Sequence, residues 1–396
     1  MINTPYFVVD KAAVDEAYDS LTVALDKYWG NYIIGYSYKT NALPWVINYF
    51  KDKGAYAEVV SDDEYNLAKY INVPIDKVIY NGPIKTKETM IEAIRGGALV
   101  NIDSQREIEW LSELSSQGAF SVGIRVNFDI EAICPNESAC GDEGGRFGFC
   151  YENGELLRAV EKIRSYGVKV NGIHLHTSSK TRSINIYKAI ANIACDVARD
   201  CNLHLEYIDV GGGFFGGLPT KPQFDDYLRE ISTILKVNFD CERVKLIVEP
   251  GMSVIGANIS YVTSVIDIKQ TTYGRFVVTD GSRMQIDPLM TKSNYFYEIK
   301  TDRNATSISK QAEQTICGYT CMEHDRLFKL RDADELSVGD IITYHKVGAY
   351  TMCLAPLFIK YFPDVYVNDN QRLIKVREKW TPNFYIQGSE LRGTKK

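Results

Sequence analysis

The sequence predicts an α/β protein: a (β/α)8 barrel of the TIM type, with a second domain made mostly of β-strands. Between residues 10 and about 260, short apolar runs alternate with amphipathic stretches of helical period. Past residue 260 the chain is rich in β-branched and aromatic residues, and helical stretches become few. Alternating strands and helices are typical of a parallel sheet, and eight such units close a barrel.

Eight apolar runs are the expected barrel strands, at residues 32–38, 55–60, 77–82, 98–103, 120–127, 168–176, 205–213 and 244–250. Stretches of helical pattern separate them, the clearest at 61–71, 86–96, 104–116 and 154–167. Glycine ends several of these stretches, as it often does at helix C-termini. A doubly wound open sheet is the alternative, but its strands would have to be sorted to two sides of a switch point.

The second domain is expected to be discontinuous. Its clearest strand patterns lie at residues 261–270, 273–282 and 340–351. The apolar run at 5–10 is expected to join them as a further strand. The predicted domains are therefore 11–262 for the barrel, and 1–10 with 263–396 for the β domain.

Composition and charge argue against several classes of partner. A formal net charge of −6 and a pI near 5.6 do not suit nucleic acid or an anionic membrane surface. No run approaches the roughly 20 apolar residues of a membrane span, and the N-terminal stretch does not resemble a signal peptide. The nine cysteines are scattered and lack C-x2-C pairs, so we expect reduced thiols, no metal and a cytoplasmic protein.

The C-terminal ends of the strands, where barrel enzymes have their active sites, carry reactive groups. These are an amine, carboxylates, imidazoles, a guanidinium and a glycine-rich turn: Lys39, Glu58, Arg125, His174, His176, Gly211, Gly212, Gly213, Glu249, Pro250 and Gly251. Lys39 ends an apolar, aromatic run. A lysine there usually extends to water, whereas partial desolvation would lower its pKa and make it nucleophilic.

Each of the other groups also has two interpretations. The glycine triplet "GGG" either makes a tight turn or binds an anion through its backbone N–H groups. His174 and His176 share one strand face and could bind a metal or stack on a flat ring, and Glu249 could merely cap a turn. Together, an activated amine, a phosphate cradle and a carboxylate meet the needs of pyridoxal phosphate (PLP).

The chain resembles the PLP-dependent diaminopimelate/ornithine decarboxylase family (Orn/Lys/Arg/DAP decarboxylases), which is related to alanine racemase. Nine segments match the family's motifs in the family's order: "TPYFVVD", "YSYKTN", "AEVVSDDEY", "RFGF", "GIHLHTSS", "DVGGGF", "EPG", "CGYTCMEHD" and "GAYT". They span nearly the whole chain. The resemblance implies a fold type III PLP enzyme that decarboxylates a small-molecule α-amino acid as a homodimer.

The resemblance also implies a role for each matching residue. Lys39 would hold the cofactor covalently, His176 would stack on its ring, and Glu249 would bond the pyridine nitrogen within the motif that contains Gly251. Arg125 and Glu58 would lie around the ring and the lysine. The phosphate would be bound by Ser179, Gly211, Gly212, Gly213 and Tyr350. Cys321 would reach across the dimer interface and protonate the carbon that CO2 leaves.

Departures from the family's pattern bear on the substrate. Met252 follows "EPG" where the decarboxylases usually have arginine, and Asp287 stands where the diaminopimelate enzymes have the arginine of Arg-Pro. Without these guanidiniums bidentate carboxylate binding is lost, so diaminopimelate itself is not expected. Asp287 and Glu323 would suit a basic substrate, with Arg283 the nearest positive group. The long loop after Asn127 would also admit a conjugated amino acid.

Two other functions stay open. A racemase or epimerase would use the same cofactor site but needs an acid or base on each face of the substrate, and the β domain offers the decarboxylase-like "TCMEHD". A non-catalytic PLP-binding regulatory homologue would explain Met252 and also Met322, which directly follows Cys321 where the family has an acidic residue. Release of CO2, loss of optical rotation, or neither would separate the three.

Overall fold

The computed structural model describes residues 2–115, 118–301, 303 and 309–390. The chain divides into two compact units, residues 17–254 and residues 1–16 with 255–396. Ser116 of the predicted helix, and Met1, 302, 304–308 and 391–396 of the predicted β domain, lie outside the described residues. The domain limits expected after residues 10 and 262 stay a prediction.

Parallel strands close a barrel in the first unit, as predicted. They are β2 (Tyr32–Ser37), β3 (Tyr56–Ser61), β4 (Val78–Ile84), β5 (Leu99–Ile102), β6 (Ser121–Asn127), β8 (Lys169–His174), β9 (Tyr207–Asp209) and β10 (Lys245–Val248). Their order is β5-β4-β3-β2-β10-β9-β8-β6, and pairing of β5 with β6 closes the ring. A short strand, β7 (Phe149–Cys150), adds to β6.

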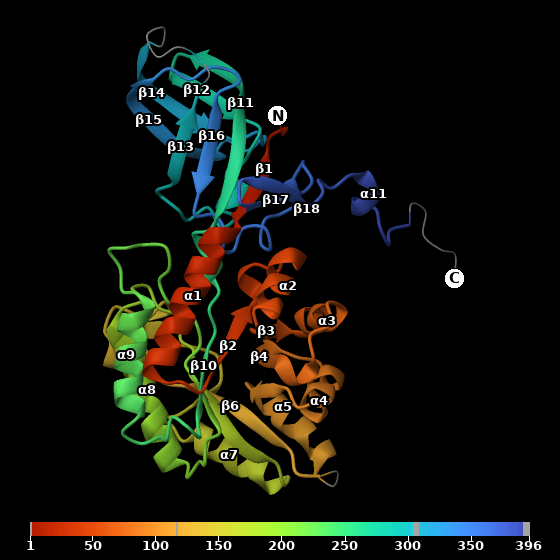
Figure 1. Cartoon of the computed structure of the whole chain (residues 1–396), viewed down its shortest axis with the longest axis vertical. Helices are drawn as coiled ribbons and strands as arrows, with labels where there is room; N and C mark the ends of the chain where they lie inside the picture. The colour runs from red at the N-terminus through yellow and green to blue at the C-terminus, as the bar shows by residue number, and fades with distance from the viewer. Residues whose placement is uncertain (1, 116–117, 302, 304–308, 391–396) are drawn as a thin grey trace. The chain divides into compact units, whose positions relative to one another are not determined.

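Helices surround these strands (Figure 1). They are α1 (Lys11–Tyr28), α2 (Pro44–Asp52), α3 (Asp62–Tyr70), α4 (Lys87–Arg95), α5 (Gln105–Trp110), α6 (Ile130–Ile133), α7 (Glu155–Ser165), α8 (Ile184–Asp200) and α9 (Phe224–Leu235). Several begin directly after a strand because a hydroxyl caps them: Ser61, Thr86 and Ser104 each accept a bond from a backbone N–H of the first turn. None of the described helices is both long and apolar enough to cross a bilayer.

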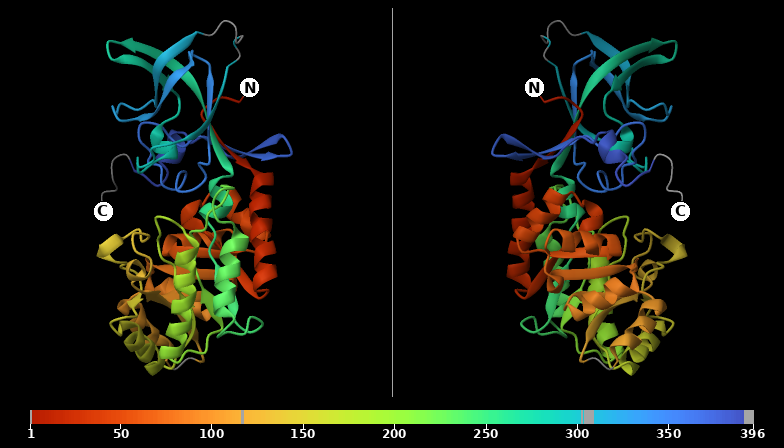
Figure 2. Two further views of the ribbon diagram at one scale, coloured as in Figure 1. Left: turned by 90° about the vertical axis from the view of Figure 1, so that its left-hand side faces the viewer. Right: turned by 90° about the vertical axis from the view of Figure 1, so that its right-hand side faces the viewer.

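Antiparallel pairing dominates the second unit. Its elements are β1 (Tyr6–Asp10), β11 (Ile259–Thr271), β12 (Gly274–Thr279), α10 (Arg283–Ile286), β13 (Phe296–Lys300), β14 (Lys310–Cys317), β15 (Arg326–Asp334), β16 (Ile341–His345), β17 (Asp364–Asp369), β18 (Arg372–Arg377) and α11 (Pro382–Tyr385). The N-terminal strand β1 lies between β11 and β17, which explains its apolar sequence. The β17–β18 hairpin projects from the rest of this unit (Figure 2).

Candidate active site

Lys39 lies just past β2, in the short 3-10 turn Tyr38–Thr40. Its Nζ donates to Oε2 of Glu58 at 2.9 Å, and the hydroxyl of Ser37 donates to the same oxygen at 2.6 Å. Glu58 is fully buried, while the Lys39 side chain is 37% exposed. The amine is therefore anchored from inside the barrel and still accessible from outside it.

Glu249 follows β10 and forms the second buried carboxylate of the site. Nδ2 of Asn81 donates to Oε1 of Glu249 at 2.5 Å and to Oε1 of Glu58 at 3.0 Å. Burial opposes the charge of Glu249, but the neighbouring His174 and Lys39 hold the pKa of its carboxyl below the usual value. Glu249 is therefore an anion.

Asp209 ends β9 beside Glu249 and has the opposite protonation state. Burial raises the pKa of Asp209 well above its usual value, and the nearby charge of Glu249 adds to this effect. His174, Asp209 and Glu249 bring possible metal-ligand atoms within 4.8 Å of one another. The raised pKa of Asp209 and the bond between Glu249 and Asn81 argue for a hydrogen-bonded cluster. The absence of a metal stays a prediction.

The glycine turn after β9 packs against His176 and Glu249. A Cβ at Gly211 would lie 2.4 Å from Cβ of His176, and one at Gly212 would lie 2.1 Å from the backbone oxygen of Glu249. The N–H of Gly212 donates to Nδ1 of His176 at 3.3 Å. Burial lowers the pKa of His176 to about 3, so its ring is neutral. Only glycine permits these approaches.

Gly251 has the same function on the other side of Glu249. A Cβ at this position would lie 2.1 Å from Oγ1 of Thr40, the residue after Lys39. The "EPG" turn can therefore lie directly against the turn that carries the lysine.

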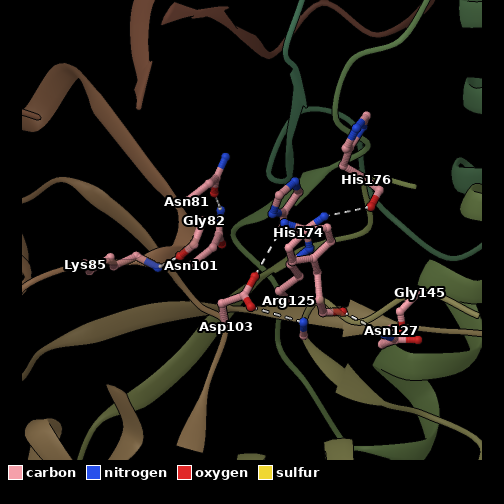
Figure 3. A network of polar contacts seen from close by, with 12 residues as sticks. Asn81, Gly82, Lys85, Asn101, Asp103, Arg125, Asn127, Gly145, His174 and His176 are labelled. Carbon is pink, nitrogen blue, oxygen red and sulfur yellow. Dashed lines mark hydrogen bonds and ion pairs between the residues drawn. The ribbon is translucent and has the colours of Figure 1, made fainter. Parts of the chain in front are cut away.

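Arg125, near the end of β6, is held by buried charges (Figure 3). Its Nη2 donates to the backbone oxygen of His176 at 3.2 Å, and its Nη1 lies 3.4 Å from Oδ2 of Asp103. Behind Asp103, the fully buried Glu107 accepts from Asp103 N at 2.9 Å and from Nζ of Lys85 at 3.1 Å. Burial lowers the pKa of Lys85, against the opposing charge of Glu107.

Ser179 lies in the loop after β8. Its hydroxyl accepts from the N–H groups of Arg182 at 2.8 Å and Thr181 at 3.2 Å. A β-bridge joins Ser179 to Ser138 in the long loop after β6. The loops that follow β6 and β8 therefore support each other.

That long loop encloses a cavity of about 600 Å³, which we call the loop cavity. Its charged lining residues are all acidic: Asp129, Glu131, Asp142 and Glu152. A smaller cavity of about 60 Å³, lined in part by Arg125 and His176, shares with it Asn127, Phe128, Ile130, Ser138 and Gly145. The loop cavity therefore adjoins the reactive side chains of the barrel.

The predicted site residues of the second unit have their own surroundings. Exposed Cys321 and Glu323 line a cavity of about 450 Å³ together with Cys317, whose thiol pKa burial raises to about 11. Tyr350 has a left-handed backbone, with φ of 55°.

The remaining predicted substrate residues are already paired. Arg283 Nε donates to Oδ2 of the buried Asp287 at 2.9 Å, and Glu323, 96% exposed, pairs with Arg326 at 3.1 Å. That Asp287, Arg283 or Glu323 contacts a substrate stays a prediction.

Four residues near the site escaped the sequence analysis: Asn81, Asn101, Tyr207 and Glu64. The signal for the asparagines is a polar residue inside an otherwise apolar strand. The signal for Glu64 is its place in "SDDE", where Ser61 accepts from Glu64 N at 3.1 Å and Glu64 accepts from Val60 N at 2.8 Å. Burial raises the pKa of Glu64 to about 7.

Known proteins resemble this chain in sequence and in fold. A family model described as pyridoxal-dependent decarboxylase, pyridoxal binding domain, matches residues 13–256. The diaminopimelate decarboxylase of Methanocaldococcus jannaschii is 25% identical over 96% of this chain and 89% of its own length. A crystal structure of the M. jannaschii enzyme has a TM-score of 0.86 at 24% identity, covering 98% of this chain and 93% of that one. Lysine decarboxylase from Selenomonas ruminantium has a TM-score of 0.74 at 21% identity, covering 93% and 94%.

Proposed function

This chain belongs to the pyridoxal-dependent decarboxylase family, and from that premise we propose that it removes CO2 from an amino acid whose far end carries a positive charge. The family gives the reaction class, a carboxy-lyase that uses PLP. One observation supports a positive charge on the substrate. All charged side chains that line the loop cavity, beside Arg125 and His176, are acidic.

The barrel residues fit the cofactor. The buried anion Glu249 suits a protonated ring nitrogen, the neutral His176 offers a flat face, and the turn Gly211–Gly213 has no side chain that would keep a phosphate away from its backbone. When bound, PLP supplies the electron sink for the charge left by CO2.

Under this proposal Lys39 attaches the cofactor covalently, and Glu58 orients its amine. Glu249 binds the ring nitrogen, His176 lies against the ring, and Arg125 holds the backbone of His176 in place. The phosphate is bound by Ser179, Gly211, Gly212, Gly213 and Tyr350, and Gly251 lets the "EPG" turn approach the lysine.

We assign the proton-donating role to Cys321 of a second copy of the chain, which makes the active unit a homodimer with shared sites. Glu323 lines the same cavity as Cys321 and is a second candidate contact for a substrate ammonium.

The size and charge of the loop cavity narrow the substrate. Its volume of about 600 Å³ lies in the range of sites that hold drug-sized ligands, so it has room for an amino acid longer than lysine. Four carboxylates favour an ammonium or guanidinium over a carboxylate at the far end. This supports a basic or conjugated amino acid, and a substrate other than diaminopimelate.

Asp142 provides the sharpest test, because no described residue donates a hydrogen bond to it, whereas Asp129, Glu131 and Glu152 cap the loop's own backbone. CO2 release should be measured on a panel of basic, conjugated and acidic amino acids and diaminopimelate. We expect Asp142→Asn to raise KM for the preferred basic substrate about fivefold, the loss of one charge-assisted contact. The neighbouring Glu143→Gln, outside the cavity lining, should change nothing. A preferred substrate with a distal carboxylate, diaminopimelate included, would overturn the proposal.

A further inference from the structure

A chain of hydrogen bonds crosses the barrel interior and ends on the two buried carboxylates of the site. The hydroxyl of Tyr207 (β9) donates to Oδ1 of Asn101 (β5) at 2.9 Å, and Nδ2 of Asn101 donates to Oδ1 of Asn81 (β4) at 2.8 Å. Nδ2 of Asn81 then donates to Glu58 and to Glu249. Asn81 and Asn101 lie side by side in Figure 3.

All bonds of this chain run in one direction. The hydroxyl of Tyr207 can donate or accept, and here it donates to the oxygen of Asn101, whose NH2 therefore faces Asn81. That NH2 occupies the oxygen of Asn81, so both hydrogens of the Asn81 amide face the carboxylates. An amide NH2 donates hydrogen bonds and does not accept one from a protonated acid, so this arrangement favours the ionised form of Glu249.

Two glycines inside barrel strands leave the space that this chain of hydrogen bonds occupies, although glycine destabilises a strand. A Cβ at Gly123 in β6 would lie 1.9 Å from Oδ1 of Asn101 and 2.1 Å from the hydroxyl of Tyr207. A Cβ at Gly172 in β8 would lie 2.0 Å from the Tyr207 ring. Glycine weakens a strand interior. Two strands thus give up side chains where Tyr207 and Asn101 lie.

We propose that Asn81 is a positioning residue that joins Glu58 and Glu249 into one hydrogen-bonded unit, and that Asn101 and Tyr207 fix its orientation. The proposal rests on the assignment of Glu249 to the ring nitrogen under the proposed function. Asn81 links the carboxylate that orients Lys39 to the one that binds the ring. It therefore holds the two carboxylates, one at each end of the cofactor site, in fixed positions relative to each other and in their charge state. Without it, the two buried carboxyl groups would lose their common donor.

Tyr207→Phe tests the far end of the chain, with Tyr80→Phe as the matched control. Tyr80 is also a fully buried tyrosine, next to Asn81 in β4, but its hydroxyl contacts Thr89 at 3.0 Å. The readouts are the melting temperature and the PLP dissociation constant of the apo-protein, from quenching of tryptophan fluorescence. We expect Tyr207→Phe to weaken PLP binding about tenfold, as for a lost hydrogen bond to a buried acceptor. Tyr80→Phe should lower the melting temperature comparably and leave PLP binding within about twofold.

A double-mutant cycle shows whether Tyr207 acts through Glu249. We expect Tyr207→Phe to have no further effect on PLP affinity in a Glu249→Gln background. The proposed action of Tyr207 on Glu249 through Asn101 and Asn81, which we call the relay, would be overturned by either of two results. One is that Tyr207→Phe changes PLP affinity by the same factor in both backgrounds, and the other is that Tyr80→Phe loses as much PLP affinity as Tyr207→Phe. Unchanged affinity in Glu249→Gln alone would overturn the assignment of Glu249 and the relay with it. The measurement needs no substrate, so a wrong substrate class leaves its outcome unaffected.

Discussion

The two units of the molecule treat their charged side chains differently. In the barrel, Lys39 and Glu249 follow strands and Glu58 lies within one, and these residues, far apart in the sequence, meet in one centre. In the β unit, Arg283 pairs with Asp287 four residues on, and Glu323 with Arg326 three residues on. The barrel therefore builds a reactive centre from distant residues, while Arg283 and Glu323 of the β unit are each neutralised by a near neighbour in the sequence. Other ion pairs of the β unit, such as Arg303–Asp340, also join distant residues.

This difference separates two uses of charge. A local pair is satisfied before any ligand arrives, so its removal should mainly affect folding. The barrel centre holds several carboxyl groups around one amine, and burial together with the charge of Glu249 raises the pKa of Asp209. A carboxylate that has no cation near it in the sequence can bind a cationic group of the cofactor. Replacing such a carboxylate should mainly affect cofactor binding and catalysis.

Loss of Lys39 should produce the largest effect. Lys39→Ala removes the amine that we assign to covalent attachment, and we expect kcat/KM to fall at least about 10³-fold. Borohydride reduction followed by mass spectrometry should find PLP attached to the wild type and not to the variant. Lys180→Ala, an exposed lysine in the loop after β8, is the control and should retain the adduct. A reducible PLP adduct in Lys39→Ala would show that another amine holds the cofactor.

The next effect should be on stability and confined to the β unit. Asp287→Asn leaves Arg283 beside Met290 O and Lys292 O without its counter-ion, so we expect a loss of about 3 kcal/mol in the free energy of unfolding. PLP affinity of the folded protein should stay unchanged. A variant of normal stability with a raised KM would instead make Asp287 a substrate contact and weaken the contrast between the units.

Much of the barrel could be predicted because its chemistry follows from topology. Parallel strands bring their C-terminal ends to one rim, so locating the strands was enough to gather Lys39, Glu58, Arg125 and Glu249. The relay from Tyr207 could not be found this way. Whether an asparagine inside an apolar strand faces the barrel axis depends on the register in which the strand pairs with its neighbours. That register cannot be inferred from the sequence.

The β unit was less predictable for a different reason. The sequence analysis did not identify β13, β14, β15, β17 or β18, because half-exposed antiparallel strands mix polar and apolar residues. All but one of the side chains of β13, for example, are exposed. The Arg283–Asp287 pair shows the same limit. Its four-residue spacing has meaning only once Arg283–Ile286 is known to form a helical turn.

Glu64 offers a smaller test, through pH, of an acid that is largely buried in the barrel. Its pKa rises from the ordinary 4.5 to about 7, mainly through burial, so between these pH values the folded state holds a proton that the unfolded chain has lost. Stability therefore falls as pH rises from about 4.5 to 7. Glu64→Gln removes the penalty and keeps the acceptor for Val60 N. We expect it to exceed the wild type by about 1–2 kcal/mol at pH 8 and to match it near pH 4.

Chemical denaturation at the two pH values measures this difference, with Asp63→Asn in the same helical turn as the control. Asp63 is exposed, so its variant should follow the wild type at both pH values. An equal gain for Glu64→Gln at pH 4 and pH 8 would mean that ionisation is not the cause.

Replacement of Glu323 should have the smallest effect on stability and activity. It tests whether a locally paired charge of the β unit can also contact the substrate. Its side chain is 96% exposed and pairs with Arg326 at the start of β15, so Glu323→Gln should leave the free energy of unfolding within about 0.5 kcal/mol of the wild type. If Glu323 reaches a substrate ammonium in the dimer, the contact is made equally in the ground and transition states. We then expect KM for a basic substrate to rise about two- to fivefold with kcat almost unchanged, the signature of lost uniform binding. Glu313→Gln, which removes another exposed, paired glutamate of the same unit, controls for a general loss of negative charge. An unchanged KM in Glu323→Gln would mean that only the acidic residues around the loop cavity of the barrel select the charge of the substrate.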